Sequence, residues 1–369
     1  MVVTNRNRAL QGTLGLSLAM GIGRFFYTPM LPLMIAALGW YSGQSAWIAT
    51  ANYLGYLLGC ILMARGMIPL RAPYFRATLM ASTLCLAAIA LTPHLGWQLL
   101  IRFLSGVFSA LIFVFITQAL PRVVRQPTHI GLVYGGVGCG IVLSGLVVSI
   151  LGSVLGWREL WLCAAVLSAL LSLVVWTWPV EKGQADSPTS VAQPASVSGR
   201  PALLKVGYFF EGFGYIIIGT YLVVLAEPVF GATAAALTWI IVGLAAAPSP
   251  MLWSQVAQRW GRKAALRACY GLQILGAITA VFGSSTILLI VAALLFGSTF
   301  MGVVMLSIAT GTQAGIPHAS ATLTTWYSVG QVLGPALVAV ALGDSIATAF
   351  VVATVALVLG FLFTLASRL

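Results

Sequence analysis

The 369-residue chain is 60% hydrophobic and 7% charged, with a formal net charge of +12. Soluble domains carry roughly 25% charged residues, so this composition excludes a water-soluble globular protein and indicates an integral membrane protein. The five cysteines all lie in apolar segments without Cys-x-x-Cys spacing, which argues against a disulfide framework or a zinc site.

A helix that crosses a bilayer needs about 20 mostly apolar residues. Twelve stretches meet this requirement: 10–37, 42–64, 73–92, 97–119, 130–152, 159–178, 204–226, 232–255, 264–283, 286–311, 318–342 and 345–366. The first is longer than the roughly 7–15 apolar residues of a signal peptide, so we interpret it as a retained span. The sequence therefore predicts an all-α integral membrane protein with twelve transmembrane helices.

One sizeable polar stretch divides these spans into two sets of six. Pro179–Pro201 is rich in Pro, Ser, Ala and Gln and cannot form a hydrophobic core. It predicts a cytoplasmic linker at 179–203 between an N-terminal bundle, 1–178, and a C-terminal bundle, 204–369. The two halves also resemble each other in sequence, since "MGIGRFFYT" in the first span aligns with "EGFGYIIIGT" in the seventh. Parallel six-helix repeats with substrate bound between them are a known transporter plan.

The basic residues fall almost entirely on one side of this topology. Fifteen of the 18 Lys and Arg residues lie in loops or chain ends on that side. Because cytoplasmic loops carry the excess of Lys and Arg, we expect both termini in the cytoplasm. The positive charge is then a topology signal, and we expect no nucleic-acid partner.

Arg24 lies in "GIGRFFYTP" (Gly21–Pro29), near the middle of the first apolar stretch. A charge at mid-bilayer costs about 2.5–3.5 kcal/mol on insertion scales, so its side chain must face protein or water. Gly21 and Gly23 loosen the helix before it and two prolines follow, and irregular backbone at membrane depth is tolerated where it lines a cavity. We expect Arg24 to line a central cavity and attract an anionic or strongly polar group. The alternative is a structural arginine bonded to backbone carbonyls.

Glu211 is the acidic residue that lies well inside a predicted span. In the alignment of the two halves it matches Met20, so Arg24 lies about 6 Å further along the equivalent helix. Two helices related by the repeat would present Glu211 and Arg24 across one cavity, where the acid takes up and releases protons. The alternative is a buried acid with a local hydrogen-bond partner.

Further polar and aromatic side chains lie inside predicted spans, where polar groups need partners. We include as candidate cavity groups Asn52, Tyr27, Tyr215, Trp326, Gln331 and Arg102. Each alone is also explained by packing or by a hydrogen bond between helices, and Arg102 also by a side chain that reaches the outer interface.

Glycines at four-residue spacing predict faces where helices approach one another closely. Gly55-x-x-x-Gly59 in the second span and Gly330-x-x-x-Gly334 in the eleventh are examples. In a protein that changes shape, such faces also let helices slide or rock.

Three segments resemble motifs of the major facilitator superfamily. "WSQVAQRWGRKAAL" (Trp253–Leu266) resembles its cytoplasmic loop motif, "RFLSGVFSA" (Arg102–Ala110) its span-four pattern, and "GQVLGP" (Gly330–Pro335) its glycine-proline motif. Within the superfamily, "GIGRFFYTP", "NYLGYLLG", "EGFGYIIIGT", "AAAPSPMLW" and "YSVGQVLGP" resemble the bacterial YbfB/YjiJ-like branch.

The resemblance implies the major facilitator fold, two pseudo-symmetric six-helix bundles, in a bacterial inner membrane and as a monomer. It also implies a cytoplasmic gate at Arg259, Gly261, Arg262 and Lys263, and it associates Arg102 with proton coupling. Few acidic residues lie on that side, so we expect helix C-terminal carbonyls to bind the gate cations. The corresponding first-half loop, "ARGMIPLRAPYFR", lacks the acidic residue and the Gly-Arg-Lys run.

Together these features predict a secondary transporter that moves a small polar or anionic organic solute by alternating access, coupled to protons. Efflux of lipophilic drug-like compounds is an alternative, since the chain has 11 Trp and 17 Phe. Another is a transporter-shaped sensor or scaffold that binds without transport. The sequence contains no P-loop, no Gly-x-Ser-x-Gly elbow and no histidine cluster, so we expect no enzymatic activity, cofactor or metal.

Overall fold

The computed structural model describes residues 5–124, 127–180, 199–231, 235–283, 285–316, 319–342 and 345–369. These residues form α-helices, two π-helical segments and no strand. In chain order the elements are α1 (Asn5–Leu16), η1 (Ser17–Ile22), α2 (Tyr27–Leu38), α3 (Ser42–Ala64), α4 (Ala72–Ile89), α5 (Leu95–Val123), α6 (Pro127–Leu151), α7 (Trp157–Val175), α8 (Pro201–Phe230), α9 (Ala236–Ala246), α10 (Ser249–Trp260), α11 (Arg262–Val281), α12 (Thr286–Gln313), α13 (Ala319–Leu337), η2 (Val338–Leu342) and α14 (Ile346–Ala366).

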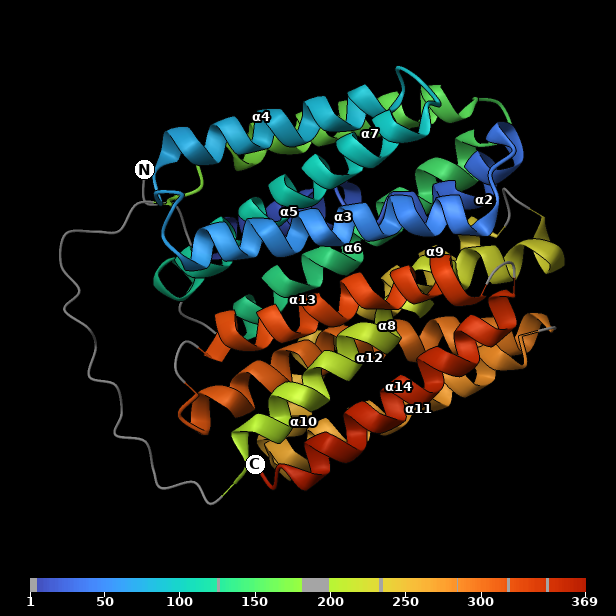
Figure 1. Cartoon of the computed structure of the whole chain (residues 1–369). Helices are drawn as coiled ribbons and strands as arrows, with labels where there is room; N and C mark the ends of the chain where they lie inside the picture. The colour runs from blue at the N-terminus through green and yellow to red at the C-terminus, as the bar shows by residue number, and fades with distance from the viewer. Residues whose placement is uncertain are drawn as a thin grey trace.

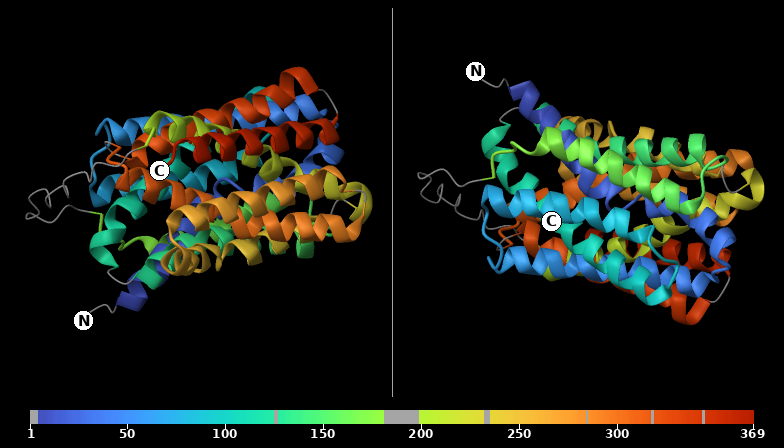
Figure 2. Two further views of the ribbon diagram at one scale, coloured as in Figure 1. Left: turned by 90° about the horizontal axis from the view of Figure 1, so that it is seen from below. Right: turned by 90° about the horizontal axis from the view of Figure 1, so that it is seen from above.

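The helices run roughly side by side along one long direction, and α1 begins near the same end of the molecule at which α14 finishes (Figures 1 and 2). We call this the terminal end and the other the opposite end. Most helices before residue 180 form one group and most helices after residue 200 form another (Figure 1). The two groups meet where α6 packs on α9, α3 on α13, and α2 on α8.

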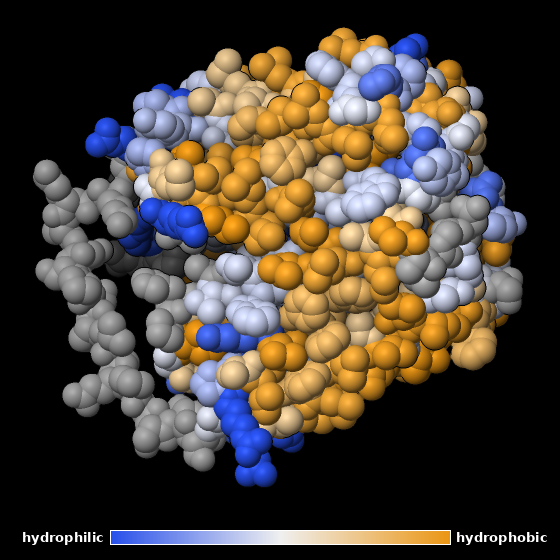
Figure 3. Space-filling model, viewed as in Figure 1, coloured by the Kyte–Doolittle hydropathy of each residue, from blue (hydrophilic) through white to orange (hydrophobic). Residues whose placement is uncertain are grey.

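Eleven helices within the described ranges are long and apolar enough to cross a membrane. Hydrophobic residues cover most of the middle of the side seen in Figure 3, and hydrophilic residues lie toward its two ends. The remaining predicted span, 318–342, corresponds to α13 and η2, which pack against α8 and α3. Its polar residues Ser328 and Gln331 are buried, so they face other helices rather than lipid.

Two predicted spans differ from single straight helices. The first, 10–37, is three segments, since η1 and a turn at 23–26 separate α1 from α2. The eighth, 232–255, is α9 followed by α10, because Pro248 has no amide hydrogen to donate to the preceding turn. α8 begins at Pro201, inside the linker predicted at 179–203, since proline fits the first turn of a helix. Most of that linker, 181–198, lies outside the described residues.

Close approach of α3 and α5 depends on glycine. A Cβ at Gly55 would overlap the carbonyl oxygen of Phe103, and one at Gly106 would overlap that of Asn52. Both contacts involve backbone, which cannot move aside as a side chain can. This is the close packing that small-residue faces allow between membrane helices.

We therefore expect Gly55→Ala to destabilise the protein by about 1–3 kcal/mol, the cost of an extra methyl group in a packed interior. The matched control is Gly271→Ala, because nothing lies within 4 Å of a Cβ at that helical position. Thermal unfolding of the purified protein in detergent compares the two variants. Equal melting temperatures would show that α3 and α5 do not need this contact.

Candidate functional site

A cavity of about 200 Å³ lies between the two groups of helices. Its walls include Met20, Arg24, Phe25, Tyr56, Phe113, Thr117, Tyr134 and Val137 from the first group and Tyr208, Tyr215, Phe300, Met301, Thr324, Tyr327 and Gln331 from the second. Thr117 lies in the last two turns of α5 and Thr324 in the first two of α13, both toward the terminal end. The cavity therefore extends from Arg24 toward the terminal end.

Arg24 sits in the turn that interrupts the first span. The amide of Gly23 donates to the Leu18 carbonyl at 2.8 Å, a five-residue spacing that widens the helix, and α2 begins only at Tyr27. A Cβ at Gly21 would overlap the backbone of Gly140, so α6 presses directly against this segment. The irregular backbone directs a charged side chain into the protein, as the glycines and prolines of this stretch predict.

The Arg24 guanidinium is enclosed by aromatic rings and has one hydrogen-bonded side-chain partner. Its Cζ lies 4.2 Å from the Tyr56 ring centroid and 4.7 Å from that of Tyr53, and Nη2 donates to Gln331 Oε1 at 2.8 Å. The side chain is 2% exposed, and Nε has no partner. No Asp or Glu is among the described residues that line the cavity. The site therefore presents a positive charge that no carboxylate of the wall neutralises.

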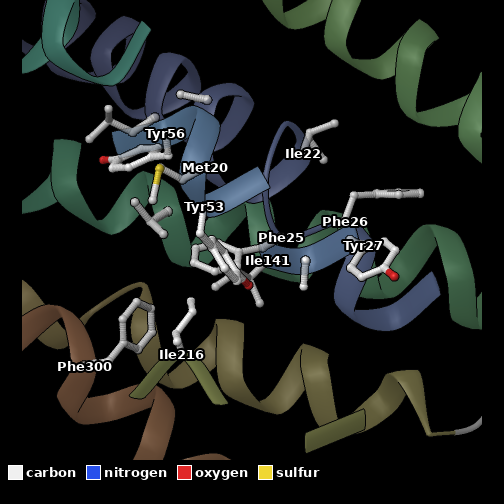
Figure 4. Close-up of a cluster of buried hydrophobic side chains, with 14 of the residues drawn as sticks. Met20, Ile22, Phe25, Phe26, Tyr27, Tyr53, Tyr56, Ile141, Ile216 and Phe300 are labelled. Carbon is white, nitrogen blue, oxygen red and sulfur yellow. The ribbon is translucent and has the colours of Figure 1, made fainter. Parts of the chain in front are cut away.

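Gln331 joins the two groups of helices at this point. Its Oε1 accepts from Arg24, and its Nε2 donates to the Tyr215 hydroxyl at 3.2 Å. Tyr215 belongs in turn to a set of nearly parallel rings, 5.3 Å from Tyr327 and 5.7 Å from Phe300 between centroids. In Figure 4, Met20 and Tyr56 lie together, and Phe300 comes from the other group of helices. Of the predicted cavity residues, Arg24, Tyr215 and Gln331 line this space.

Arg102, Asn52 and Tyr27 lie behind the cavity wall rather than on it. Arg102 Nη2 donates to the Arg24 carbonyl at 3.2 Å, and Asn52 Nδ2 donates to the Arg102 carbonyl at 2.9 Å. The Arg102 guanidinium also covers the Tyr27 ring at 4.8 Å. A broken helix leaves carbonyls without their usual partners, and buried carbonyls must be satisfied. Arg102 therefore supports the interruption that places Arg24.

Glu211 is fully buried in α8 and is not part of the cavity wall. Its Oε1 accepts from Gln273 Nε2 of α11 at 2.8 Å, whereas Oε2 has no partner. The predicted meeting of Glu211 with Arg24 across one cavity is absent from this structure, since each is bonded to a different glutamine. Tyr208, three residues before Glu211 on the same helix, does reach the cavity.

Trp326 lies on the outside of α13, with 42% of its surface exposed. The neighbouring residue Tyr327 lines the cavity instead. Successive side chains of an α-helix point about 100° apart, so the adjacent position faces the interior when this one faces outward. Trp326 is therefore not a cavity residue here.

The predicted gate motif lies at the terminal end, between α10 and α11. Arg262 Nη1 donates to the Ala309 carbonyl at 2.8 Å in the last turns of α12, and Lys263 Nζ donates to the Arg368 carbonyl at 2.9 Å. Gly261 has φ +84°, a conformation that favours glycine, while Arg259 is exposed on α10. Backbone carbonyls thus accept the hydrogen bonds of both Arg262 and Lys263. This is the kind of acceptor that we expect, because few acidic residues lie on this side.

Among the described residues, at least two hydrogen bonds join the groups of helices on the side of Arg24 that faces the opposite end. Thr28 Oγ1 donates to the Gly219 carbonyl at 2.8 Å, and Tyr53 Oη lies 2.8 Å from Thr220 Oγ1. Both pairs are buried. We call them the crossing bonds. They hold α2 and α3 against α8 beyond the cavity.

Comparison with known proteins places this architecture in a family. Residues 16–365 match the family described as the uncharacterised MFS-type transporter YbfB, where MFS denotes the major facilitator superfamily. The chain belongs to this family. The resemblance of its motifs to the YbfB-like branch is thereby confirmed, and so is the major facilitator fold.

Individual relatives agree with this assignment. The chain is 27% identical over 267 residues to the probable transporter SCO4007 of Streptomyces coelicolor, covering 68% of this chain and 61% of that protein. It is 28% identical over 171 residues to the putative uncharacterized transporter YgaY of Escherichia coli K12, covering 44% of this chain and 42% of that protein. The matched region thus spans less than two thirds of either relative.

Solved structures share the fold at low sequence identity. The nucleoside transporter NupG superposes with a TM-score of 0.73 at 17% identity, covering 98% of this chain and 99% of that chain. The human organic anion transporter MFSD10 superposes with a TM-score of 0.66 at 16% identity, covering 98% and 100%. At this identity the likeness concerns the fold alone.

Several residues at the site of this YbfB-family protein are not among those predicted from sequence. Tyr56 and Tyr53 enclose Arg24, and Phe300, Tyr327 and Tyr208 complete the aromatic wall. The spacing of Tyr53 and Tyr56, three residues apart on α3 beside Asn52, is the one local signal that indicates a shared face. The other three look like ordinary apolar residues of a membrane helix.

Proposed function

We propose that this MFS transporter moves a small polar or anionic organic solute across the bacterial inner membrane, coupled to protons. The observation that carries the proposal is Arg24, a buried cation on a cavity whose described wall contains no acidic residue. Burying an unpaired charge is costly, so a site that keeps one is suited to a ligand of opposite charge. The guanidinium fork matches a carboxylate or a phosphate in geometry.

Alternating access is the mechanism that this arrangement supports best. The cavity reaches from Arg24 toward the terminal end, while the crossing bonds join the helix groups on the other side of Arg24. With the basic loops and both termini in the cytoplasm, this is an inward-facing state. Rocking of the two bundles, 1–178 and 204–369, about the site would open the other side.

Glu211 is the candidate proton carrier. Its carboxyl is buried with a single hydrogen-bonded partner, Gln273, and leaves Oε2 unsatisfied. A proton on this group removes a buried charge and supplies a donor, whereas loss of the proton favours any rearrangement that brings a cation or water to it. Tyr208 connects this carboxyl to the cavity, because it lies three residues before Glu211 on α8 and also lines the cavity.

The proposal is tested with the purified protein in two steps. Thermal unfolding in the presence of organic anions, sugars, nucleosides, amines and lipophilic cations selects the ligands that stabilise it. Reconstituted vesicles then report counterflow of a radiolabelled ligand and the change in lumen pH that accompanies its movement, each corrected for protein-free vesicles. We expect organic anions to bind, to cross and to move protons.

Other results would replace this proposal by a specific alternative. Stabilisation by lipophilic cations, with counterflow of those compounds, would favour efflux of drug-like molecules. A ligand that stabilises the protein but never crosses the vesicle membrane would indicate a sensor or scaffold with a transporter fold.

A further inference from the structure

We infer that the cavity is built for one small planar aromatic monocarboxylate, such as a benzoate-like compound. The inference rests on the proposed function, anion transport, and narrows its substrate class. Three properties of the cavity carry it: the number of charges on its wall, the orientation of its rings and its small volume.

The charge of the wall fits one negative charge on the substrate. Arg24 is the one charged side chain among the described residues that line the cavity. A dicarboxylate would leave its second carboxylate without a cation, and an amino acid would leave its ammonium group without an anion. Each such unpaired charge is expensive to desolvate, so a monoanion is the best match.

The rings of the wall fit a flat apolar body. Tyr215 and Phe300 are nearly parallel, with an interplanar angle of 15°, and Tyr215 and Tyr327 make an angle of 21°. Tyr56 and Phe25 lie beside the Arg24 guanidinium, and Phe300 comes from the other group of helices (Figure 4). A planar ring packs against such faces with offset-stacked contacts, whereas a puckered ring or a branched chain does not.

The size and polarity of the cavity argue against larger or hydroxyl-rich solutes. Its volume of about 200 Å³ is below the roughly 300–1,000 Å³ of pockets for drug-sized ligands. Besides Arg24 and the tyrosine hydroxyls, its polar side chains are Thr117, Thr324 and Gln331. The rest of the lining consists of Met, Phe, Val, Ile and Ala side chains, and a sugar hydroxyl placed against them would lose its hydrogen bond to water without a replacement.

Gln331 gives the carboxylate a defined place to bind. A carboxylate can bind an arginine through two parallel hydrogen bonds, one from Nε and one from the Nη on the same side. Arg24 Nε has no partner, and Nη2 donates to Gln331 Oε1. The substrate would therefore compete with the Gln331 amide oxygen for Nη2 and release Gln331 toward Tyr215, to which its Nε2 already donates.

The experiment measures affinities of five probes for the full purified chain by competition against radiolabelled benzoate. The probes are benzoate, cyclohexanecarboxylate, benzamide, phthalate and acetate, which change the ring, the charge or both. We expect benzoate to bind roughly 2- to 12-fold more tightly than cyclohexanecarboxylate, the gain from ring stacking. Benzamide, phthalate and acetate should bind more weakly than either.

Two variants test whether these differences in affinity arise from the rings and the charge of the cavity wall. Phe300→Leu keeps an apolar side chain but removes one of the rings, so it should reduce the preference for benzoate over cyclohexanecarboxylate. Arg24→Gln should weaken both monocarboxylates by roughly 10- to 150-fold, the value of charge-assisted hydrogen bonds, and leave benzamide unchanged. If Arg24→Gln does not fold, the Phe300→Leu comparison still decides the inference.

The possible failures are distinct. Equal binding of benzoate and cyclohexanecarboxylate, or tighter binding of phthalate, would overturn the aromatic monocarboxylate while leaving anion transport in place. Binding of acetate as tight as that of benzoate would do the same. Absence of binding by every anion, with binding of neutral or cationic compounds in the screen described above, would overturn the proposed function itself.

Discussion

Uptake of organic anions should fall by roughly 10- to 150-fold when Arg24 is replaced by Gln, because hydrogen bonds to charged groups contribute about 1.5–3 kcal/mol. Gln keeps a polar side chain able to bond Gln331 but removes the positive charge of the cavity wall. The initial rate of counterflow in reconstituted vesicles, at a ligand concentration below saturation, measures this effect. The loss should appear at low concentration and be partly recovered at high concentration, as expected for weakened binding.

The control for this variant is Arg158→Gln. Arg158 is exposed in the first turn of α7 and does not line the cavity, so the same substitution changes the net charge without touching the cavity. It should transport as the wild type does. Normal transport by Arg24→Gln, together with a lowered melting temperature, would instead make Arg24 a structural residue of the broken helix.

Replacement of Glu211 by Gln should separate proton movement from substrate movement. Gln has the shape of the neutral carboxyl and can bond Gln273, but it cannot release a proton. We expect the pH change that accompanies anion flux to disappear and counterflow of the anion to persist. The rate of counterflow should also become independent of pH in this variant. Lumen pH and radiolabel are recorded on the same vesicles.

Glu227→Gln provides the matched control, since Glu227 lies on the same helix, α8, in its last turn at the opposite end. This variant should retain coupled proton flux. If Glu211→Gln moved protons and anions together as the wild type does, the proton carrier would have to be a group other than Glu211.

Much of the fold could be predicted from the sequence because lipid imposes a simple rule of length and apolarity. The predicted stretch 42–64 coincides with α3, and 286–311 differs from α12 by two residues. The interruption at Arg24 could also be predicted, since two glycines, a proline and a charge coincide in nine residues. The π-helical form of η1 could not, because it depends on how closely α6 packs against it.

The partners within the site could not be predicted, and the reasons are physical. Arg24 and Gln331 are 307 residues apart, and Glu211 and Gln273 are 62 apart, so no local pattern specifies either pair. The sequence predicts Trp326 as a cavity residue, whereas Tyr327 lines the cavity, and this difference has another cause. A membrane helix is apolar on all sides, so hydropathy does not tell which face meets lipid and which meets the cavity.

The crossing bonds have a consequence for how the protein should respond to its surroundings. Thr28 with Gly219 and Tyr53 with Thr220 are neutral pairs, each contributing about 0.5–1.5 kcal/mol. Together they would favour the present arrangement over one opened at the opposite end by roughly 5- to 150-fold in population. Because neither pair is ionic, this ratio should hardly depend on ionic strength, unlike that of a gate closed by surface charges.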